Sequence, residues 1–337
     1  MQAILTHLGR TLGSAALLCC TTVYAQSLSD FQYDESITAV SCCDVCCGDD
    51  CCGDPCCGDV CCGSSCSDGL LCGLIKPSDH CFDDFISPMT NPTLFEDPRT
   101  LTELRGIFLQ HKVPLVPAAG GDIQVYALQI RAALTDRLSI IATKDGYAVS
   151  SNPLIRDGWA DVAAGLKYNL IRNVRDQRLL SAGLTYEMPV GSRRTLQGNG
   201  NGEFHLFLTG GTEFLDYGHW LSASGLRLAA DSGDDSSLWY WSNHFDYQIF
   251  DGIYALTEFN WYNWIDSGAG GINGVEGGDL FNLGSTGVTG NDIVTGAFGA
   301  KYKPNGNLEF GVAWELPLTE RRDVLENRLT VDAILRY

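Results

Sequence analysis

The chain has 337 residues, 45% of them apolar, and a formal net charge of −19. A chain of this length can bury a large core, so size does not limit the choice of fold. The negative charge argues against nucleic acid as a partner, because nucleic-acid binding depends on basic side chains that neutralise phosphates.

Residues 1–25 have the features of a secretory signal peptide. Arg10 is their only charged residue, an apolar run covers residues 11–22, and Val23 and Ala25 are the small residues expected before a cleavage site. The run is shorter than the roughly 18 residues of a spanning helix, so a membrane anchor is the less favoured alternative. No later apolar run reaches that length, so an exported membrane form must be a β-barrel.

Residues 26–100 are predicted to be a periplasmic leader with CCGDx repeats. Thirteen cysteines lie between residues 42 and 81. In an oxidising compartment a disulfide-bonded segment is the favoured interpretation, and cross-linking to an envelope partner is an alternative. Paired thiolates could also bind Zn or Cu, and no other cofactor is expected. The candidate metal ligands are Cys46, Cys47, Cys51, Cys52, Cys56, Cys57, Cys61 and Cys62.

The end of this leader, FISPMTNPTLFEDPR at residues 85–99, contains three prolines. Proline fixes a backbone angle and lacks an N–H donor, so an ordered but irregular lead-in is predicted.

From residue 101 to residue 337, apolar residues alternate with small or polar ones at the period of a β-strand. Short connections alternate with long ones, and the strand count is even. These features predict an all-β fold, an up-and-down antiparallel transmembrane barrel of about twelve strands. The candidate strands are 101–112, 122–134, 137–147, 158–171, 178–188, 203–214, 219–228, 237–249, 253–264, 291–303, 308–316 and 327–337.

The last strand ends on an aromatic residue and has one apolar face, formed by Leu329, Val331, Ala333, Leu335 and Tyr337. Here the chain resembles bacterial outer-membrane barrel proteins, and its Gly-rich pattern resembles a porin-like transporter family labelled after the MetA pathway of phenol degradation. The resemblance implies insertion by the barrel assembly machinery. It also implies transport of small solutes, with hydrophobic or aromatic compounds as cargo.

If the apolar face meets lipid, the opposite face lines the lumen. A channel lining with weak cation preference is favoured over paired charges that plug a closed barrel. The lumen candidates are Asp161, Lys167, Glu187, Glu258, Asn260, Lys301, Glu309, Glu315, Arg328, Asp332 and Arg336. Aromatic residues toward strand ends fit the girdles at membrane interfaces, which weighs against a soluble β-sandwich. The girdle candidates are Trp239, Trp241, Tyr247, Trp261, Trp264, Tyr302 and Trp314.

The Gly-rich loop at residues 265–290, between the candidate strands 253–264 and 291–303, is expected to be a solvated surface loop. Folding inward or binding a divalent cation are the alternatives.

Enzymatic activity is not expected. Ser242 and His244 share a strand face that Asn243 does not, and neither His205 nor His219 lies in a catalytic motif. The predicted function is an outer-membrane channel for small solutes, with the N-terminal segment and the C-terminus in the periplasm. The alternative is a structural or adhesive anchor cross-linked through its cysteines.

Overall fold

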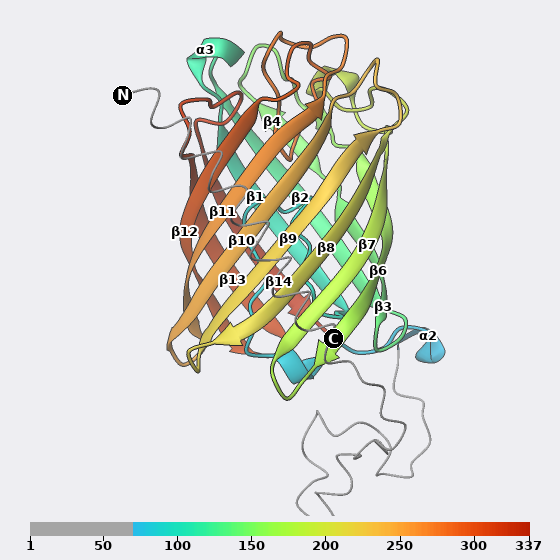
Figure 1. The fold of residues 1–337 in the computed structure, drawn as a ribbon, viewed down its shortest axis with the longest axis vertical. Coiled ribbons are helices and arrows are strands. Elements are labelled where there is room, and N and C mark those ends of the chain that lie inside the picture. Colours follow the sequence, from blue (N-terminus) through green and yellow to red (C-terminus); the bar gives the residue numbers. More distant parts are fainter. Residues whose placement is uncertain (1–69) are drawn as a thin grey trace, which may run out of the picture. The chain divides into compact units, whose positions relative to one another are not determined.

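The computed structural model describes residues 70–337, which form a closed barrel of 12 antiparallel strands (Figure 1). The predicted all-β barrel is therefore confirmed. The eight cysteine metal candidates, the signal peptide and the repeats lie outside the described residues. Among residues 70–337, no helix combines the length and the apolar character needed to cross a membrane.

The wall contains fourteen strand segments, because two of its strands are interrupted. Strand β1 pairs with both β14 and β2, and this closes the barrel. The segments are β1 Glu103–Lys112, β2 Asp122–Ala133, β3 Leu138–Lys144, β4 Tyr147–Ser150, β5 Gly158–Trp159, β6 Val162–Asn173, β7 Arg178–Met188, β8 Glu203–Phe214, β9 Gly218–Ala229, β10 Ser237–Phe250, β11 Ile253–Asp266, β12 Asp292–Asn305, β13 Leu308–Pro317 and β14 Asn327–Arg336. Short helical turns are α2 Leu70–Gly73, η3 His80–Phe82, α3 Leu115–Ala118 and η4 Arg193–Thr195.

The alternation in the sequence sets which side chains face out. In β13, Phe310, Val312 and Trp314 are exposed, whereas Glu309 and Glu315 on the other face are fully buried. This is the reverse of a water-soluble sandwich, and it produces an apolar outer surface around a polar interior. The same rule orients the last strand, whose apolar face is the outer one.

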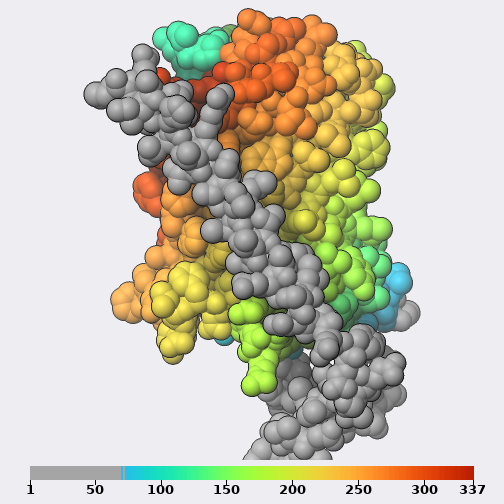
Figure 2. All heavy atoms as spheres, in the orientation of Figure 1, coloured from blue at the N-terminus to red at the C-terminus, as the bar shows by residue number. Residues whose placement is uncertain are grey.

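The two ends of the barrel differ. Short turns join the strands at one end, called the lower end here, and long loops join them at the other, upper end (Figure 1). The long loop between β11 and β12 does not behave as the solvated loop expected from the sequence. Val275, Leu280 and Phe281 are buried in an apolar cluster with residues of β1 and β2, so the loop folds inward. Figure 2 shows the upper loops as a closely packed layer above the strands.

One predicted girdle residue, Trp264, is placed differently. It is fully buried and packs in the largest apolar cluster inside the barrel. The reason is parity: Trp261 faces outward in β11, and Trp264, three positions later, must face inward.

Candidate functional site: the barrel interior and the interrupted wall

The lead-in, residues 85–99, runs inside the barrel. Phe85, Ile86, Met89 and Thr90 have 0% exposure, although the segment belongs to no strand. Prolines and the absence of strand pairing leave its backbone groups free to bond with lumen side chains. The lead-in is therefore irregular, as predicted from its prolines, and it occupies the lumen of the barrel.

Side chains of the wall form hydrogen bonds with backbone groups of the lead-in. Glu258 of β11 accepts hydrogen bonds from the backbone N–H groups of Met89 (2.7 Å) and Thr90 (2.6 Å). The Tyr240 hydroxyl donates to the carbonyl of Leu94 at 2.7 Å. These contacts hold the segment as a built-in part of the barrel, because each buried backbone group needs such a partner.

Buried charges concentrate in the lower half of the lumen and bind the lead-in by ion pairs. We call this group the lower network. Arg131 bridges Glu96 of the lead-in (2.6 Å) and Glu103 of β1 (3.0 Å). Arg336 bridges Glu103 and Glu309, both at 2.8 Å. The members are Glu96, Asp97, Arg99, Glu103, Arg105, Arg131, Lys167, Lys301, Glu309, Asp332 and Arg336.

All eleven lumen candidates from the sequence lie on the inner side of the wall, but they do not line an open aqueous passage. Lys167, Lys301, Glu309, Asp332 and Arg336 belong to the lower network. Arg328 pairs with Glu315 and with Asp279 of the long loop, Glu187 pairs with Lys144, and Asp161 accepts backbone N–H groups from Gly191 and Gly198. Glu258 binds the lead-in, and Asn260 donates to Thr90.

The three histidines considered as catalytic candidates, His205, His219 and His244, are buried lumen residues, and two of them join an internal chain of hydrogen bonds. His219 and His244 both contact Asp246, and His244 also contacts Glu258 at 2.6 Å. Both ring nitrogens of His244 face carboxylate oxygens, which fits a charged imidazolium that supports Glu258. His205 instead contacts the Tyr240 hydroxyl. No set of three or more metal-ligating side chains is found within residues 70–337.

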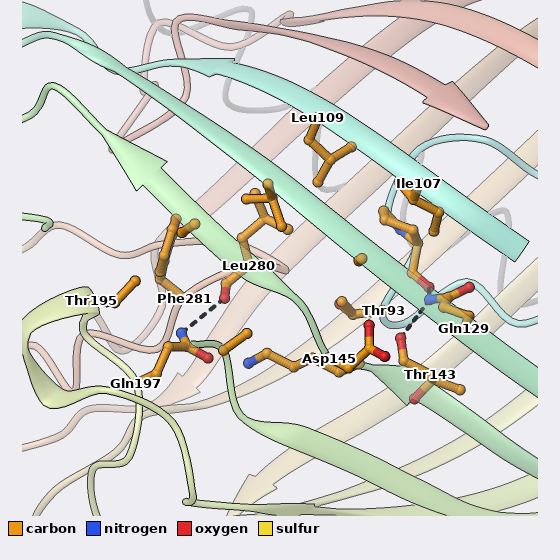
Figure 3. Close-up of a pocket in the computed structure, with 16 residues that line it drawn as sticks. Thr93, Ile107, Leu109, Gln129, Thr143, Asp145, Thr195, Gln197, Leu280 and Phe281 are labelled. Carbon is orange, nitrogen blue, oxygen red and sulfur yellow. Dashed lines mark hydrogen bonds between the residues drawn. The ribbon is translucent and has the colours of Figure 1, made fainter. Parts of the chain in front are cut away.

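The upper half of the lumen contains an inner cavity of about 40 Å³ (Figure 3). Apolar side chains such as Ile107, Leu109 and Phe281 form most of its lining, and Gln197 closes one side by donating to the carbonyl of Leu280. The hydroxyls of Thr143 and Thr195 line it without a hydrogen-bond partner among the described residues. The space is large enough for a few water molecules, and the two hydroxyls provide polar partners for them.

The wall beside this cavity is interrupted. Residues 127–129 of β2 lie between the stretch that pairs with β4 and the stretch that pairs with β3, and they have no ladder partner on that side. The Asp145 carboxylate takes up one orphaned donor, the backbone N–H of Leu128, at 2.7 Å. Gly146 follows with a φ of +121°, and a Cβ there would lie 2.6 Å from the Tyr126 carbonyl oxygen. The chain can pass this close only with glycine at that position.

An outer groove of about 650 Å³ lies on the other side of the interruption. Phe108, Tyr126 and Trp159 form its aromatic rim, and small residues such as Gly106 and Ala333 lie along it. The inner cavity and the outer groove share four lining residues, Ile107, Ala127, Asp145 and Ala160. The two spaces are therefore separated by little more than the interrupted wall.

The remaining girdle candidates lie on the outer face. Trp239 and Trp261 pack edge to face at 5.2 Å toward the upper end, and Tyr247 and Tyr302 lie toward the lower end. Trp241 and Trp314 also point outward.

Sequence reasoning missed the roles of Asp145, Gly146 and the unpartnered hydroxyl of Thr143. The KDG triplet at residues 144–146, inside a predicted strand, was the one signal that could have marked the interruption.

A scan against protein-family models gives no match, and no curated protein matches the sequence. Solved structures do match. An outer-membrane channel from Pseudomonas putida F1 aligns with a TM-score of 0.51 at 11% identity, over 75% of this chain and 100% of the channel. The NanC porin aligns at a TM-score of 0.44 and 8% identity, covering 70% and 98%. The KdgM porin aligns at 0.42 and 12%, covering 70% and 99%. The first of these likenesses shows the fold.

Proposed function

We propose that this chain is an outer-membrane channel that takes up small hydrophobic compounds through its interrupted wall. The observation that carries the proposal is the inner cavity and the outer groove, which share four lining residues across the break between β3 and β4. A compound dissolved in the bilayer would collect in the outer groove and pass Asp145 and Ala160 to reach the lumen. The resemblance to transporters of the MetA pathway fits the same cargo.

An axial route for hydrophilic solutes is less favourable. The lead-in fills the lower half of the lumen and extends to the inner cavity, which Pro92 and Thr93 help to line. Its charges are bound in the lower network. Breaking that network would leave buried charges without partners, at a cost of several kcal/mol. The lateral route needs a smaller change, a separation of short segments where ladder bonds are already missing.

The membrane placement is part of this proposal. Its support is the apolar outer face, the outward aromatic residues near both ends, and an even number of strands, which brings the two ends of the barrel chain to the same side. We propose that the lower end faces the periplasm, together with the cysteine-rich segment and the C-terminus. The outward face of β14 is the segment expected to engage the barrel assembly machinery.

The test compares uptake of a small aromatic hydrocarbon and of a small sugar. Cells that lack the protein are complemented with wild type, with Ala160→Phe, or with Ala300→Phe as the matched control. Ala160 lines both spaces, whereas Ala300 lies exposed on the continuous wall of β12. We expect the protein to speed hydrocarbon uptake, Ala160→Phe to abolish that gain and Ala300→Phe to keep it. Equal loss in both variants, or fast sugar permeation by wild type, would contradict the lateral route.

The second candidate function is an anchor without transport, and the filled lumen favours it. In that case the barrel would hold the cysteine-rich segment at the membrane, and disulfide bonds to an envelope partner would fix it there. Wild-type protein that inserts into the outer membrane but changes the uptake of neither solute, and that migrates as a larger species only without reducing agent, would support the anchor.

A further inference from the structure

Three arginines form an exposed basic patch at the upper end of the interrupted wall. Arg156 lies between β4 and β5, and Arg193 and Arg194 lie in η4. The two loops are joined by a hydrogen bond from the Arg156 backbone N–H to the Arg194 carbonyl at 2.9 Å. This arginine patch is unexpected on a chain with a net charge of −19.

The arginine patch adjoins the outer groove. The backbone N–H of Ser192 donates to the carbonyl of Trp159 at 2.8 Å, and the Trp159 side chain forms part of the aromatic rim of the groove. The Trp159 and Tyr147 rings pack edge to face at 5.1 Å. Such outward aromatic residues lie at the level of lipid head groups, so the arginines just beyond them lie where head-group phosphates are found.

The three guanidinium groups form no ion pairs with the described residues of the chain. No salt bridge involves Arg156, Arg193 or Arg194 within residues 70–337. Arg193 makes one long hydrogen bond, from Nε to the Gly198 carbonyl at 3.3 Å. The neighbouring carboxylate, Asp157, accepts the backbone N–H of Ser150 at 2.7 Å. The patch therefore has donors left for an external anion.

We propose that the arginine patch and the outer groove together bind one phosphorylated lipid of the surrounding leaflet. Guanidinium groups match phosphate oxygens in a fork geometry, and each such charge-assisted pair is stronger than a neutral hydrogen bond. The apolar groove receives an acyl chain of the same molecule. The proposal rests on the membrane placement proposed above. A compound that takes the lateral route would have to displace the acyl chain from the outer groove.

The test measures binding to the full-length protein in detergent, with diphosphorylated lipid A, its dephosphorylated form and inorganic phosphate as probes. The test variant is Arg156→Gln with Arg193→Gln and Arg194→Gln. The matched control replaces three exposed arginines of the lower end, Arg137→Gln with Arg175→Gln and Arg178→Gln. Heat-modifiable gel mobility verifies that every variant is folded.

We expect wild type and the control to bind lipid A, and the test variant to bind it roughly tenfold or more weakly, as loss of charge-assisted hydrogen bonds implies. Dephosphorylation should weaken binding to wild type similarly. Equal binding of both lipid forms, equal weakening in the control, or binding of inorganic phosphate as tight as that of lipid A would each overturn the proposal. Because binding is measured without transport, a failure here leaves the uptake test untouched, and a failed uptake test leaves this one readable.

Discussion

The two halves of the lumen are closed in different ways. In the lower half, charged side chains of the wall and the lead-in pair with one another, and Arg131, Lys301 and Arg336 each contact two carboxylates. In the upper half, apolar loop residues such as Phe281 make most of the closure, a few buried ion pairs such as Arg328 with Asp279 lie beside them, and small cavities remain. We call the lower network, together with the lead-in that it binds, the seal. We call the upper loops that close the barrel above the inner cavity the upper cover.

The difference indicates which half of the barrel can rearrange at the lower cost in free energy. Separating the many paired buried charges of the lower network is costly. The contacts around the inner cavity are mostly apolar and can rearrange if the ion pair of Lys144 with Glu187 is kept. The interruption in the wall lies next to the cavity and away from the lower network. This distribution of contacts supports the proposed route through the side of the barrel, with the passage along its axis remaining closed.

The largest expected effect comes from the seal. Arg131→Ala removes one of the two cationic partners of each of two buried carboxylates, since Glu96 keeps Lys167 and Glu103 keeps Arg336. It should lower the free energy of unfolding by about 3 kcal/mol, the low end for a broken buried ion pair. It should also loosen the lead-in, so that planar bilayers carry an ionic current greater than that of wild type. Urea unfolding followed by gel mobility measures the first effect, and single-channel recording the second.

The control for the seal is Arg178→Ala, at an exposed arginine of β7 near the same end. Removal of a surface charge should change the stability by no more than about 0.5 kcal/mol. If the two variants were equally stable, the lower network would not be what closes the lower half.

A smaller effect is expected at the interruption. Gly146→Ala places a methyl group against the Tyr126 carbonyl at a positive φ, and should cost about 1–2 kcal/mol. The substitution pushes β4 away from β2, so hydrocarbon uptake should rise even though stability falls. Gly270→Ala in the long upper loop is the control, because the nearest atom to its new Cβ would be 3.8 Å away and Gly270 lines neither the inner cavity nor the outer groove. Unchanged hydrocarbon uptake by the Gly146→Ala variant would show that the interruption is not part of the transport route.

Much of the wall could be predicted because one physical rule governs it. Alternation with period 2 fixes both the strand and the direction of each side chain, so predicted strands such as 203–214 coincide with observed ones. The misplaced Trp264 was an inconsistency with this rule, since Trp261 in the same strand already faced outward.

The filling of the lumen could not be predicted in the same way. The lead-in has no period, and its position depends on contacts distant in sequence, such as that between Ser87 and Glu309. The inward fold of the long loop depends similarly on Glu276, whose carboxylate accepts the backbone N–H groups of Leu283 and Ser285. Single residues with several distant partners leave no local pattern in a sequence.

The smallest effect concerns the pH dependence of the upper cover. Burial raises the pKa of Asp323, in the loop before β14, to about 6 against the opposing influence of Arg321, and the Asp323 carboxylate accepts the backbone N–H of Glu276. Below about pH 3 this carboxyl is largely protonated in both the folded and the unfolded state. As the pH rises toward 6, the unfolded state ionises first, so the folded state loses stability across this range. Asp323→Asn should remove this loss, so the difference in urea midpoint between the two proteins should change between pH 4 and pH 7. A constant difference across that range would mean that Asp323 does not make the stability of the upper cover depend on pH.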